Sequence, residues 1–380
     1  MSTARDYRPL GLQGPRAAGR WTLAALVAAL AACTSAPPTK PTGLPAGAVV
    51  REGSRWVPVA WQELPGWSAD QPLAAWPALL QSCQQPASAW TLLCSDVQRR
   101  APRNDAEMRD WLLRNFQPYR VESHDGAAGG LITGYYEPLV DARRVASGAY
   151  RSALYSPPPD LATRRPYWTR RELDTLPAAQ AALRGREIAW VADPLDALVL
   201  QIQGSGRLRV TEPDGRERTV RLAYAGTNDH PYRSVGRWLI EQGELQPGQA
   251  SWPAIRDWAR RNPARLNELL WANPRYVFFR EEALPDPSVG PRGAQGTSLT
   301  PGRSIAVDPK SVPYGTPVWI DTTEPLTSTP LRRLVLAQDT GSAIIGAVRA
   351  DYFWGWDGDA AEQAGRMRQP LRMWVLWPRH

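Results

Sequence analysis

Short apolar runs separated by turn residues are the pattern that most limits what this chain can fold into after residue 130. Most are too short for helices, and several are bounded by glycine or proline. With 37 Pro and 30 Gly among 380 residues, a helical bundle is excluded. The pattern predicts a mainly β fold with added helices, and the close strand spacing suggests a barrel. The runs lie at residues 131–138, 197–203, 207–210, 220–222, 277–279, 303–307, 316–320, 334–339 and 373–376.

Two neighbouring runs illustrate how these strands are identified. In residues 197–203, leucine and isoleucine at even positions alternate with valine and glutamine at odd positions, which predicts a strand. Residues 207–210 and 220–222 flank the sequence Pro-Asp-Gly at 213–215, a hairpin turn signal.

Helical spacing of apolar residues is found before residue 116 and between residues 234 and 271. A first helix is predicted over 73–80, interrupted by Pro77, and a second near 106–116 with Asn104 or Asp105 as its cap. Three more are predicted to begin near Ser234, after Ser251, and at Asn262 with Pro263 in the first turn.

The N-terminus has the features of an export signal. Two arginines precede an apolar run at 21–32, which is shorter than the roughly 20 residues that span a bilayer. The run ends in Leu-Ala-Ala-Cys, which resembles the bacterial lipobox. The sequence therefore predicts a signal peptide at 1–32 and a lipidated Cys33 with a flexible tether over 33–47; an ordinary signal peptide with an incidental cysteine is the alternative. Thr34 after the cysteine favours sorting to the outer membrane.

The remaining cysteines and the charge exclude several classes of function. Cys83 and Cys94 suggest a disulfide in an exported chain, although two buried free thiols would fit as well. The three histidines are scattered, so no metal site is expected, and the absence of a phosphate-binding loop leaves no cofactor to expect. The net charge of +8 comes from interspersed acids and bases, which gives no case for nucleic-acid binding.

The best candidates for chemistry are Asp339 and Asp351, twelve residues apart across a glycine-rich turn. Cleavage of a glycosidic bond needs a carboxylic acid that protonates the leaving oxygen. Tyr352, Phe353 and Trp354 could supply a face on which a sugar stacks. Spacing alone leaves a second interpretation open, in which Asp339 caps a turn and Asp351 is an ordinary surface residue.

Other polar positions are weaker candidates. Glu137 could be a second carboxylate or only the end of a strand, and Asp229 with His230 could be a loop element. Sugar hydroxyls could bind to a group of glutamines and glycines that could equally form a tight hairpin: Gln201, Gln203, Gly204 and Gly206.

Taken together, these segments resemble one family, the membrane-bound lytic murein transglycosylase A family. The matching strings occur in the family's order and cover about residues 130–380. They are Thr-Gly-Tyr-Tyr-Glu-Pro at 133–138, Leu-Gln-Ile-Gln-Gly-Ser-Gly at 200–206, residues 224–236, residues 273–279, residues 299–308, and residues 339–355.

The resemblance implies a two-domain fold. A double-psi β-barrel domain would combine residues 48–138 with 284–380, and a second β-rich domain would be inserted over 139–283. The glycan would lie in a groove between the two.

The resemblance also implies the activity. The family cleaves the β-1,4 bond between N-acetylmuramic acid and N-acetylglucosamine in peptidoglycan without water and leaves a 1,6-anhydro ring. Asp351 matches its single acid/base residue, Asp339 a supporting carboxylate, and Thr133 and Tyr135 a groove-lining segment. Ile345 departs from the pattern, because many members have a lysine there, so a lysine contact to the sugar is in doubt.

Two other functions fit the same residues. One is an inverting hydrolase that uses Asp351 and Asp339 with a water between them. The other is a non-catalytic wall-binding lipoprotein. In each case the chain would be anchored by lipid at the periplasmic face of the outer membrane, and any protein partners would be sought among those of cell-wall synthesis or division.

Overall fold

The computed structural model describes residues 44–379 except 100 and 357. The signal peptide, Cys33 and the tether up to residue 43 lie outside the described residues. From Pro45 onward the chain forms one compact unit. No helix in the described part of the chain is both long and apolar enough to cross a membrane.

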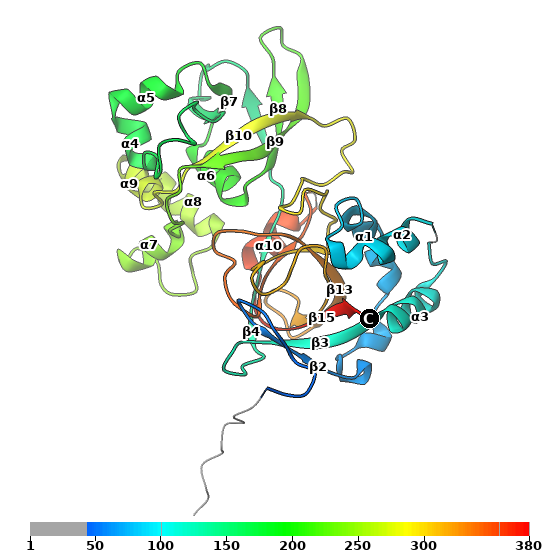
Figure 1. Cartoon of the computed structure of the whole chain (residues 1–380). Helices are drawn as coiled ribbons and strands as arrows, with labels where there is room; N and C mark the ends of the chain where they lie inside the picture. Colours follow the sequence, from blue (N-terminus) through cyan, green and yellow to red (C-terminus); the bar gives the residue numbers. More distant parts are fainter. Residues whose placement is uncertain (1–43, 100, 357, 380) are drawn as a thin grey trace, which may run out of the picture. The chain divides into compact units, whose positions relative to one another are not determined.

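The larger of the two sheets forms a barrel (Figure 1). In the described chain this sheet has nine strands, and β4 is the last of them in sheet order. Because β4 also pairs with β15, the strands from β15 to β4 form a closed ring. Two of the pairings, β11 with β13 and β14 with β4, are parallel. In sheet order the strands are β1 (Val49–Val50), β2 (Arg55–Pro58), β3 (Phe116–Glu122), β15 (Arg368–Pro378), β12 (Pro317–Thr323), β13 (Pro330–Asp339), β11 (Ser304–Val307), β14 (Arg349–Phe353) and β4 (Gly130–Tyr135).

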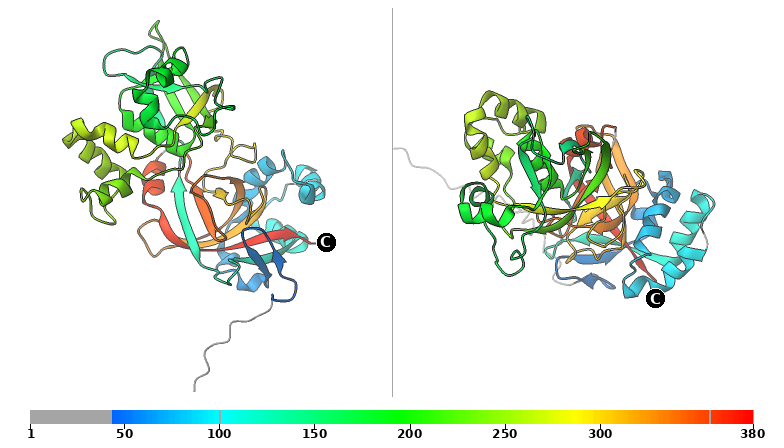
Figure 2. Two further views of the ribbon diagram at one scale, coloured as in Figure 1. Left: turned by 60° about the vertical axis from the view of Figure 1, so that its left-hand side comes forward. Right: turned by 90° about the horizontal axis from the view of Figure 1, so that it is seen from above.

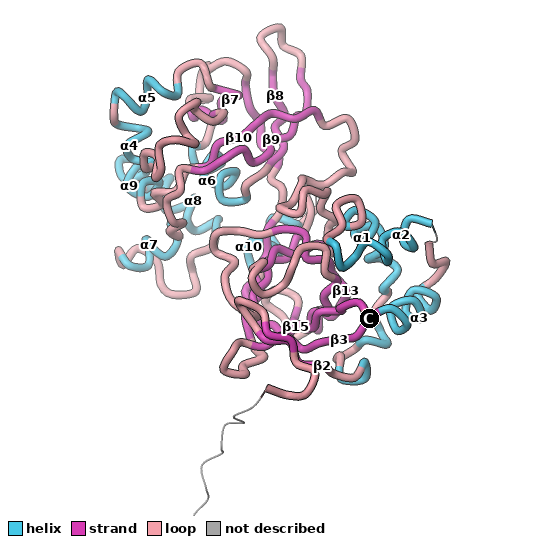
Figure 3. Tube along the Cα trace, viewed as in Figure 1, coloured by secondary structure: helices cyan, strands magenta, loops and turns pink. Residues whose placement is uncertain are grey.

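Several barrel strands, such as β11 and β12, are buried on both faces, which explains their nearly continuous apolar runs. In β12, Val318 and Ile320 point into the barrel core, whereas Trp319 packs with a tryptophan-rich cluster outside it. That cluster contains α1 (Trp76–Ser82), α2 (Thr91–Arg99) and α3 (Asp105–Asn115), which cover the barrel (Figure 3). Cys83, at the end of α1, is disulfide-bonded to Cys94 in α2.

The second sheet is made of strands that lie between β4 and β11 in the chain (Figure 2). Its order is β10 (Val277–Ala283), β9 (Glu217–Thr227), β8 (Gly206–Thr211), β5 (Leu139–Arg143), β7 (Glu187–Val191) and β6 (Ser152–Tyr155). The helices of this part are α4 (Arg170–Thr175), α5 (Pro177–Leu183), α6 (Pro194–Gln203), α7 (Val235–Glu241), α8 (Trp252–Arg261) and α9 (Leu266–Trp271).

The predicted fold class, mainly β with helices, a barrel and a second β-rich part, is confirmed. Most predicted helices are confirmed too, with side-chain caps from Asn104, Ser234 and Ser251. Pro77 lies in the first turn of α1, where a proline is tolerated, rather than inside a longer helix. Asn262 does not cap the next helix, because its amide donates to the carbonyl of Trp258 and a 3-10 turn precedes α9.

One strand prediction was wrong: residues 197–203 belong to the helix α6. Leu195, Leu198, Val199 and Ile202 recur at three- and four-residue spacing, and this periodicity prevails over the even-odd alternation. The helix has Asp193 as a side-chain cap and ends at Gly204, whose φ of 80° is the left-handed conformation of a helix terminus.

Candidate active site

The strand register brings Asp339 and Asp351 to the same place in the barrel sheet. On the central strand β11, Ala306 is paired with Asp351 of β14 on one side and with Asp339 of β13 on the other. Paired residues point to the same face, and neighbouring strands lie about 4.8 Å apart, so the two Cα atoms are separated by roughly 10 Å. A bulge after Ile305 puts Asp339, rather than Gln338, opposite Ala306.

Asp351 has one hydrogen-bond partner on the neighbouring strand. Thr133 is its register partner on β4, and the Thr133 hydroxyl donates to Asp351 Oδ1 at 2.5 Å. Burial raises the pKa of Asp351 to about 6, against the opposing effects of the Thr133 hydrogen bond and the Arg349 charge. Repulsion from Asp339 raises this pKa as well but is the smallest contribution, so burial rather than a like-charge pair makes Asp351 a weak acid.

Asp339 is held by three donors. The backbone N–H groups of Ala294 and Thr340 each donate to its Oδ1 at 2.9 Å, and the Tyr135 hydroxyl donates to its Oδ2 at 3.0 Å. Burial raises the pKa of Asp339 although these hydrogen bonds oppose the shift. The pKa of Tyr135 is raised well above its usual value by burial and by the two aspartates, so the phenol stays a neutral donor.

Arg349 is a site residue that was not predicted from the sequence. Its Nη2 donates to Thr133 Oγ1 at 2.9 Å, and the same side chain reaches the carbonyl of Leu131. Arg349 precedes Asp351 by two positions on β14 and therefore lies on the same face of the strand. That spacing was the signal available in the sequence.

This arrangement suits a residue that must both give and take a proton. A carboxyl group with a pKa of about 6 is present in both forms near neutral pH, whereas an ordinary aspartate is almost wholly ionised. Asp339, with both of its oxygens occupied by protein donors, is less free to act on a substrate.

The predicted stacking face is wrong for Tyr352 and Phe353, because both are fully buried. Alternation along β14 turns Tyr352 into the barrel core when Asp351 points outward, and the Tyr352 hydroxyl bonds to Arg333 and the Gly302 carbonyl. Trp354 is half-buried and directs its indole N–H to the Met367 sulfur at 3.3 Å.

Three of the residues predicted to bind sugar have structural partners in α6 and around it. Gln201 is buried and accepts a hydrogen bond from Arg170, and Gln203 accepts one from the backbone N–H of Tyr136 at 3.1 Å. Gly204 ends the helix. The tight hairpin that was the alternative to sugar binding does not form, because these residues end a helix. Gln201 does not fit the sugar-binding role either, since its side chain is buried and its oxygen accepts from Arg170.

The weaker carboxylate candidates have structural partners too. Glu137 is completely buried between Arg207 at 2.8 Å and Arg221 at 2.6 Å, so it is the centre of an ion-pair cluster. Asp229 has a φ of 59° and His230 bonds to the carbonyl of Tyr167 at 2.8 Å, which makes this pair a loop element.

A well-formed pocket lies elsewhere. It has a volume of about 1150 Å³ and is lined mainly by α6, α8 and α10 (Ala360–Arg366), and neither Asp339 nor Asp351 contributes to its wall. Its acidic groups Asp193 and Glu362 are paired with arginines, whereas Asp351 makes no ion pair within the described part of the chain. Among the described residues, no group of three or more His, Cys, Asp or Glu could hold a metal ion.

Comparison with known proteins points to one family. Residues 131–280 match the MltA specific insert domain, and residues 303–377 match the 3D domain. Membrane-bound lytic murein transglycosylase A of Escherichia coli (strain K12) is 31% identical over 265 residues, 68% of this chain and 68% of that protein.

Two solved structures are also similar. Lytic transglycosylase LtgG of Burkholderia pseudomallei is 47% identical, with coverage of 88% of this chain and 100% of that one and a TM-score of 0.60. MltA from Neisseria gonorrhoeae, in its monoclinic form, is 31% identical, with coverage of 88% and 96% and a TM-score of 0.73.

Proposed function

Since the chain belongs to the membrane-bound lytic murein transglycosylase A family, we propose that it cleaves peptidoglycan glycan strands with Asp351 as its only acid/base residue. The chain is a lytic transglycosylase that acts on the β-1,4 bond between N-acetylmuramic acid and N-acetylglucosamine and leaves 1,6-anhydromuramic acid ends. The role of Asp351 rests on its surroundings. Its carboxyl group is half-buried and accepts a hydrogen bond from one hydroxyl, and burial raises its pKa to about 6.

The proposed reaction needs one carboxyl group and no water. Protonated Asp351 gives its proton to the glycosidic oxygen, the bond from that oxygen to the muramic C1 breaks, and positive charge develops at C1. The C6 hydroxyl of the same sugar then attacks C1, and its proton passes to the Asp351 carboxylate, which restores the acid. Attack within one sugar ring profits from a high effective molarity.

Asp339 has a supporting role in this proposal. Its ionised form would face the developing positive charge at C1, and through the Tyr135 hydroxyl it fixes one wall of the site. Thr133 and Tyr135 would line the groove, with Trp354 at its margin. The proposed domains, a barrel of 48–138 with 284–380 and an insert of 139–283, would supply the two sides of that groove.

An inverting hydrolase with Asp339 as base is less well supported. A base of this kind needs a lone pair aimed at a water molecule, and three of the roughly four lone-pair sites of the Asp339 carboxylate already accept hydrogen bonds from the protein. The mass of the products separates the two reactions. Digestion of purified peptidoglycan should release muropeptides that are lighter than hydrolysis products by one water; products of full hydrolytic mass would overturn the proposal.

We also propose that Cys33 carries a lipid that anchors the enzyme to the periplasmic face of the outer membrane. The relatives named membrane-bound support membrane association in general. In a Gram-negative host, wild-type protein should incorporate labelled fatty acid and fractionate with the outer membrane. Cys33→Ser should do neither; incorporation that persists in Cys33→Ser would contradict the anchor.

A further inference from the structure

Arg349 is a half-buried arginine that makes no ion pair with any carboxylate of the described chain. Its guanidinium donates to the Thr133 hydroxyl at 2.9 Å and to the backbone carbonyls of Leu131 and Ala350. Withdrawing a cation from water without an acidic partner is costly, so a protein keeps such a group only where its charge or its donors are needed.

The hydrogen-bond chemistry of Thr133 limits what Arg349 can be doing. A guanidinium only donates, so the Arg349 N–H must occupy a lone pair of Thr133 Oγ1. The single proton of that hydroxyl is then left for Asp351 Oδ1, 2.5 Å away. A cationic donor also polarises the hydroxyl, which makes it a better donor and a poorer acceptor.

We propose that Arg349 is a positioning residue for the proton transfer, because it orients the Thr133 hydroxyl toward Asp351 Oδ1 and thereby keeps the catalytic proton on Oδ2. Oδ2 has no hydrogen-bond partner among the described residues, so it is the oxygen that can face the glycosidic bond. The inference rests on the proposed role of Asp351 and adds to it which oxygen carries the proton and what fixes that choice.

Several charged or titratable groups surround Asp351. Arg349 shares its strand, Tyr135 comes from β4 and Asp339 from β13. Arg368 on β15 is the register partner of Thr133 and acts on Arg349, but it is not among the groups that shift the pKa of Asp351. Burial lowers the pKa of Arg349, with a smaller lowering from Arg368, but an arginine starts so high that it stays charged. Arg349 is therefore a fixed cation across the working pH range.

The test compares Arg349→Gln, Thr133→Val and the double variant on purified peptidoglycan, by kcat, KM and the pH profile. We expect Arg349→Gln to lower kcat about 10-fold to 100-fold, the scale of lost orientation, with little change in KM. The wild-type rate should fall above a pH of about 6, where Asp351 ionises. Both single variants should move this fall to higher pH, because each removes a group that stabilises the carboxylate.

The double variant decides whether Arg349 acts through Thr133. If it does, adding Arg349→Gln to Thr133→Val should cost less than about twofold further, whereas independent effects would multiply. Arg349→Lys keeps the charge and should restore part of the rate. Arg368→Gln is the matched control, since Arg368 is exposed and lies beside the same threonine but donates no hydrogen bond to it; its rate and pH profile should match wild type.

Thermal melting identifies a variant that fails to fold. A carbon NMR titration of Asp351 in Arg349→Lys and Thr133→Val then measures the pKa of Asp351 directly, without turnover. An unchanged pH profile in Arg349→Gln, or losses that multiply in the double variant, would overturn the positioning role while Asp351→Asn remained inactive. Full activity of Asp351→Asn would instead remove the proposed function itself.

Discussion

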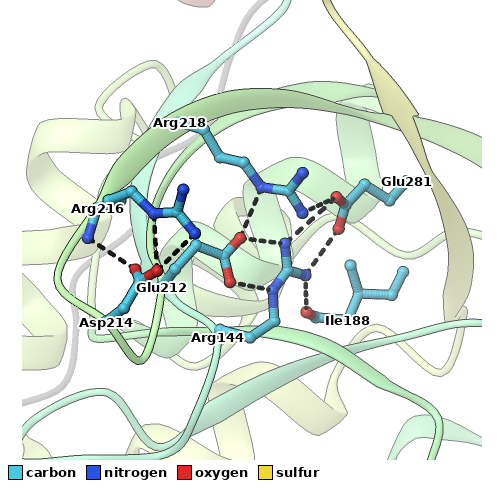
Figure 4. Close-up of polar contacts among 7 residues, drawn as sticks. All are labelled: Arg144, Ile188, Glu212, Asp214, Arg216, Arg218 and Glu281. Atoms are coloured by element: carbon cyan, nitrogen blue, oxygen red, sulfur yellow. Dashed lines mark hydrogen bonds and ion pairs between the residues drawn. The ribbon is translucent and has the colours of Figure 1, made fainter.

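The barrel and the second sheet each hold a cluster of acidic side chains, and the two clusters have opposite electrostatics. In the second sheet, Glu212 and Glu281 share Arg144, and Arg218 bonds to both, as Figure 4 shows. These pairings lower the pKa of Glu212 to about 2, chiefly through the hydrogen bond from Arg144. In the barrel, burial dominates and the pKa of Asp351 is raised to about 6.

The difference lies in how the cations are used. The guanidinium of Arg144 contacts its carboxylates directly at 2.7–3.2 Å, whereas Arg349 reaches Asp351 only through a threonine. A direct pair fixes the charged form of an acid and makes it useless for proton transfer at neutral pH. An indirect contact leaves the acid protonatable, which suits the acid/base role proposed for Asp351, whereas the directly paired carboxylates of the other cluster suit a stabilising role.

The largest expected effect is the difference in turnover between two variants that each replace one carboxylate by an amide, one in each cluster. Asp351→Asn should reduce turnover of peptidoglycan by at least about 10²–10⁴-fold, the range for loss of a general acid, while glycan binding persists. Glu212→Gln should leave turnover at the wild-type level, because no element of the proposed reaction uses it. Rates from release of anhydro-muropeptides, with a pull-down on insoluble peptidoglycan for binding, make the comparison. Equal losses in both variants would show that the contrast has no functional meaning.

A smaller loss is expected for Asp339→Asn. The amide keeps an oxygen that can accept from Ala294 and Thr340 but loses the negative charge near the reacting sugar. We expect kcat to fall about tenfold, well short of the Asp351 variant. The same rate assay measures this loss of kcat. Asp308→Asn is not a suitable control, because the Asp308 carboxylate also accepts hydrogen bonds from backbone N–H groups. A loss as large as that of Asp351→Asn would revive the two-carboxylate hydrolase.

The comparison also shows which parts of the site could be predicted from sequence. Asp339 and Asp351 were found from a glycine-rich string and a family pattern, but their meeting depends on an extra residue in β13, where its register with β11 shifts, and on the pairing of both strands with β11. The two-residue spacing from Asp351 places Arg349 on the same face of the strand, but it does not reveal a partner. Only the parallel pairing with β4 brings Arg349 to Thr133.

The strand prediction for residues 197–203 was wrong for a different reason. Their leucines satisfy both a period of two and a helical spacing, and the deciding signals are the cap at Asp193 and the terminal Gly204. The prediction that Tyr352 lies on a sugar-stacking face was wrong because alternation along a strand assigns residues to faces only when the face of one residue is already known. Five of the nine strands of the barrel sheet (β4, β11, β12, β13 and β15) were predicted from apolar runs, whereas β1, β2, β3 and β14 were not.

The free energy of unfolding should respond to pH with opposite sign at the two carboxyl groups. The raised pKa of Asp351 makes the fold less stable as the pH rises from about 4 to about 6, so Asp351→Asn should stabilise the protein at pH 7 by roughly 1–3 kcal/mol. The lowered pKa of Glu212 contributes stability above about pH 4.5 that is lost as the pH falls toward 2.

Glu212→Gln should therefore destabilise at pH 7 by roughly 1–2 kcal/mol, reduced from the full shift because the side chain is 18% exposed, and the deficit should shrink below pH 4. Urea denaturation at pH 7 and at low pH measures both variants on one scale. If both variants changed the free energy of unfolding at pH 7 in the same direction, the two clusters would not have the opposite electrostatics that their contacts indicate.

The smallest effect is expected at the tip of the β8–β9 hairpin, where Asp214 and Arg216 form an ion pair in Figure 4 that lies beside the Glu212 network. Both side chains are largely exposed, at 49% and 84%, so water and salt screen the pair and Asp214 fixes little besides its own turn. Asp214→Asn should leave the urea midpoint unchanged within error at low and high salt, while Glu212→Gln lowers it in the same series. A salt-dependent loss in Asp214→Asn would mean that the exposed pair is coupled to Arg144 and Glu212. The stability of the second sheet would then come from one extended network rather than from the half-buried contacts alone.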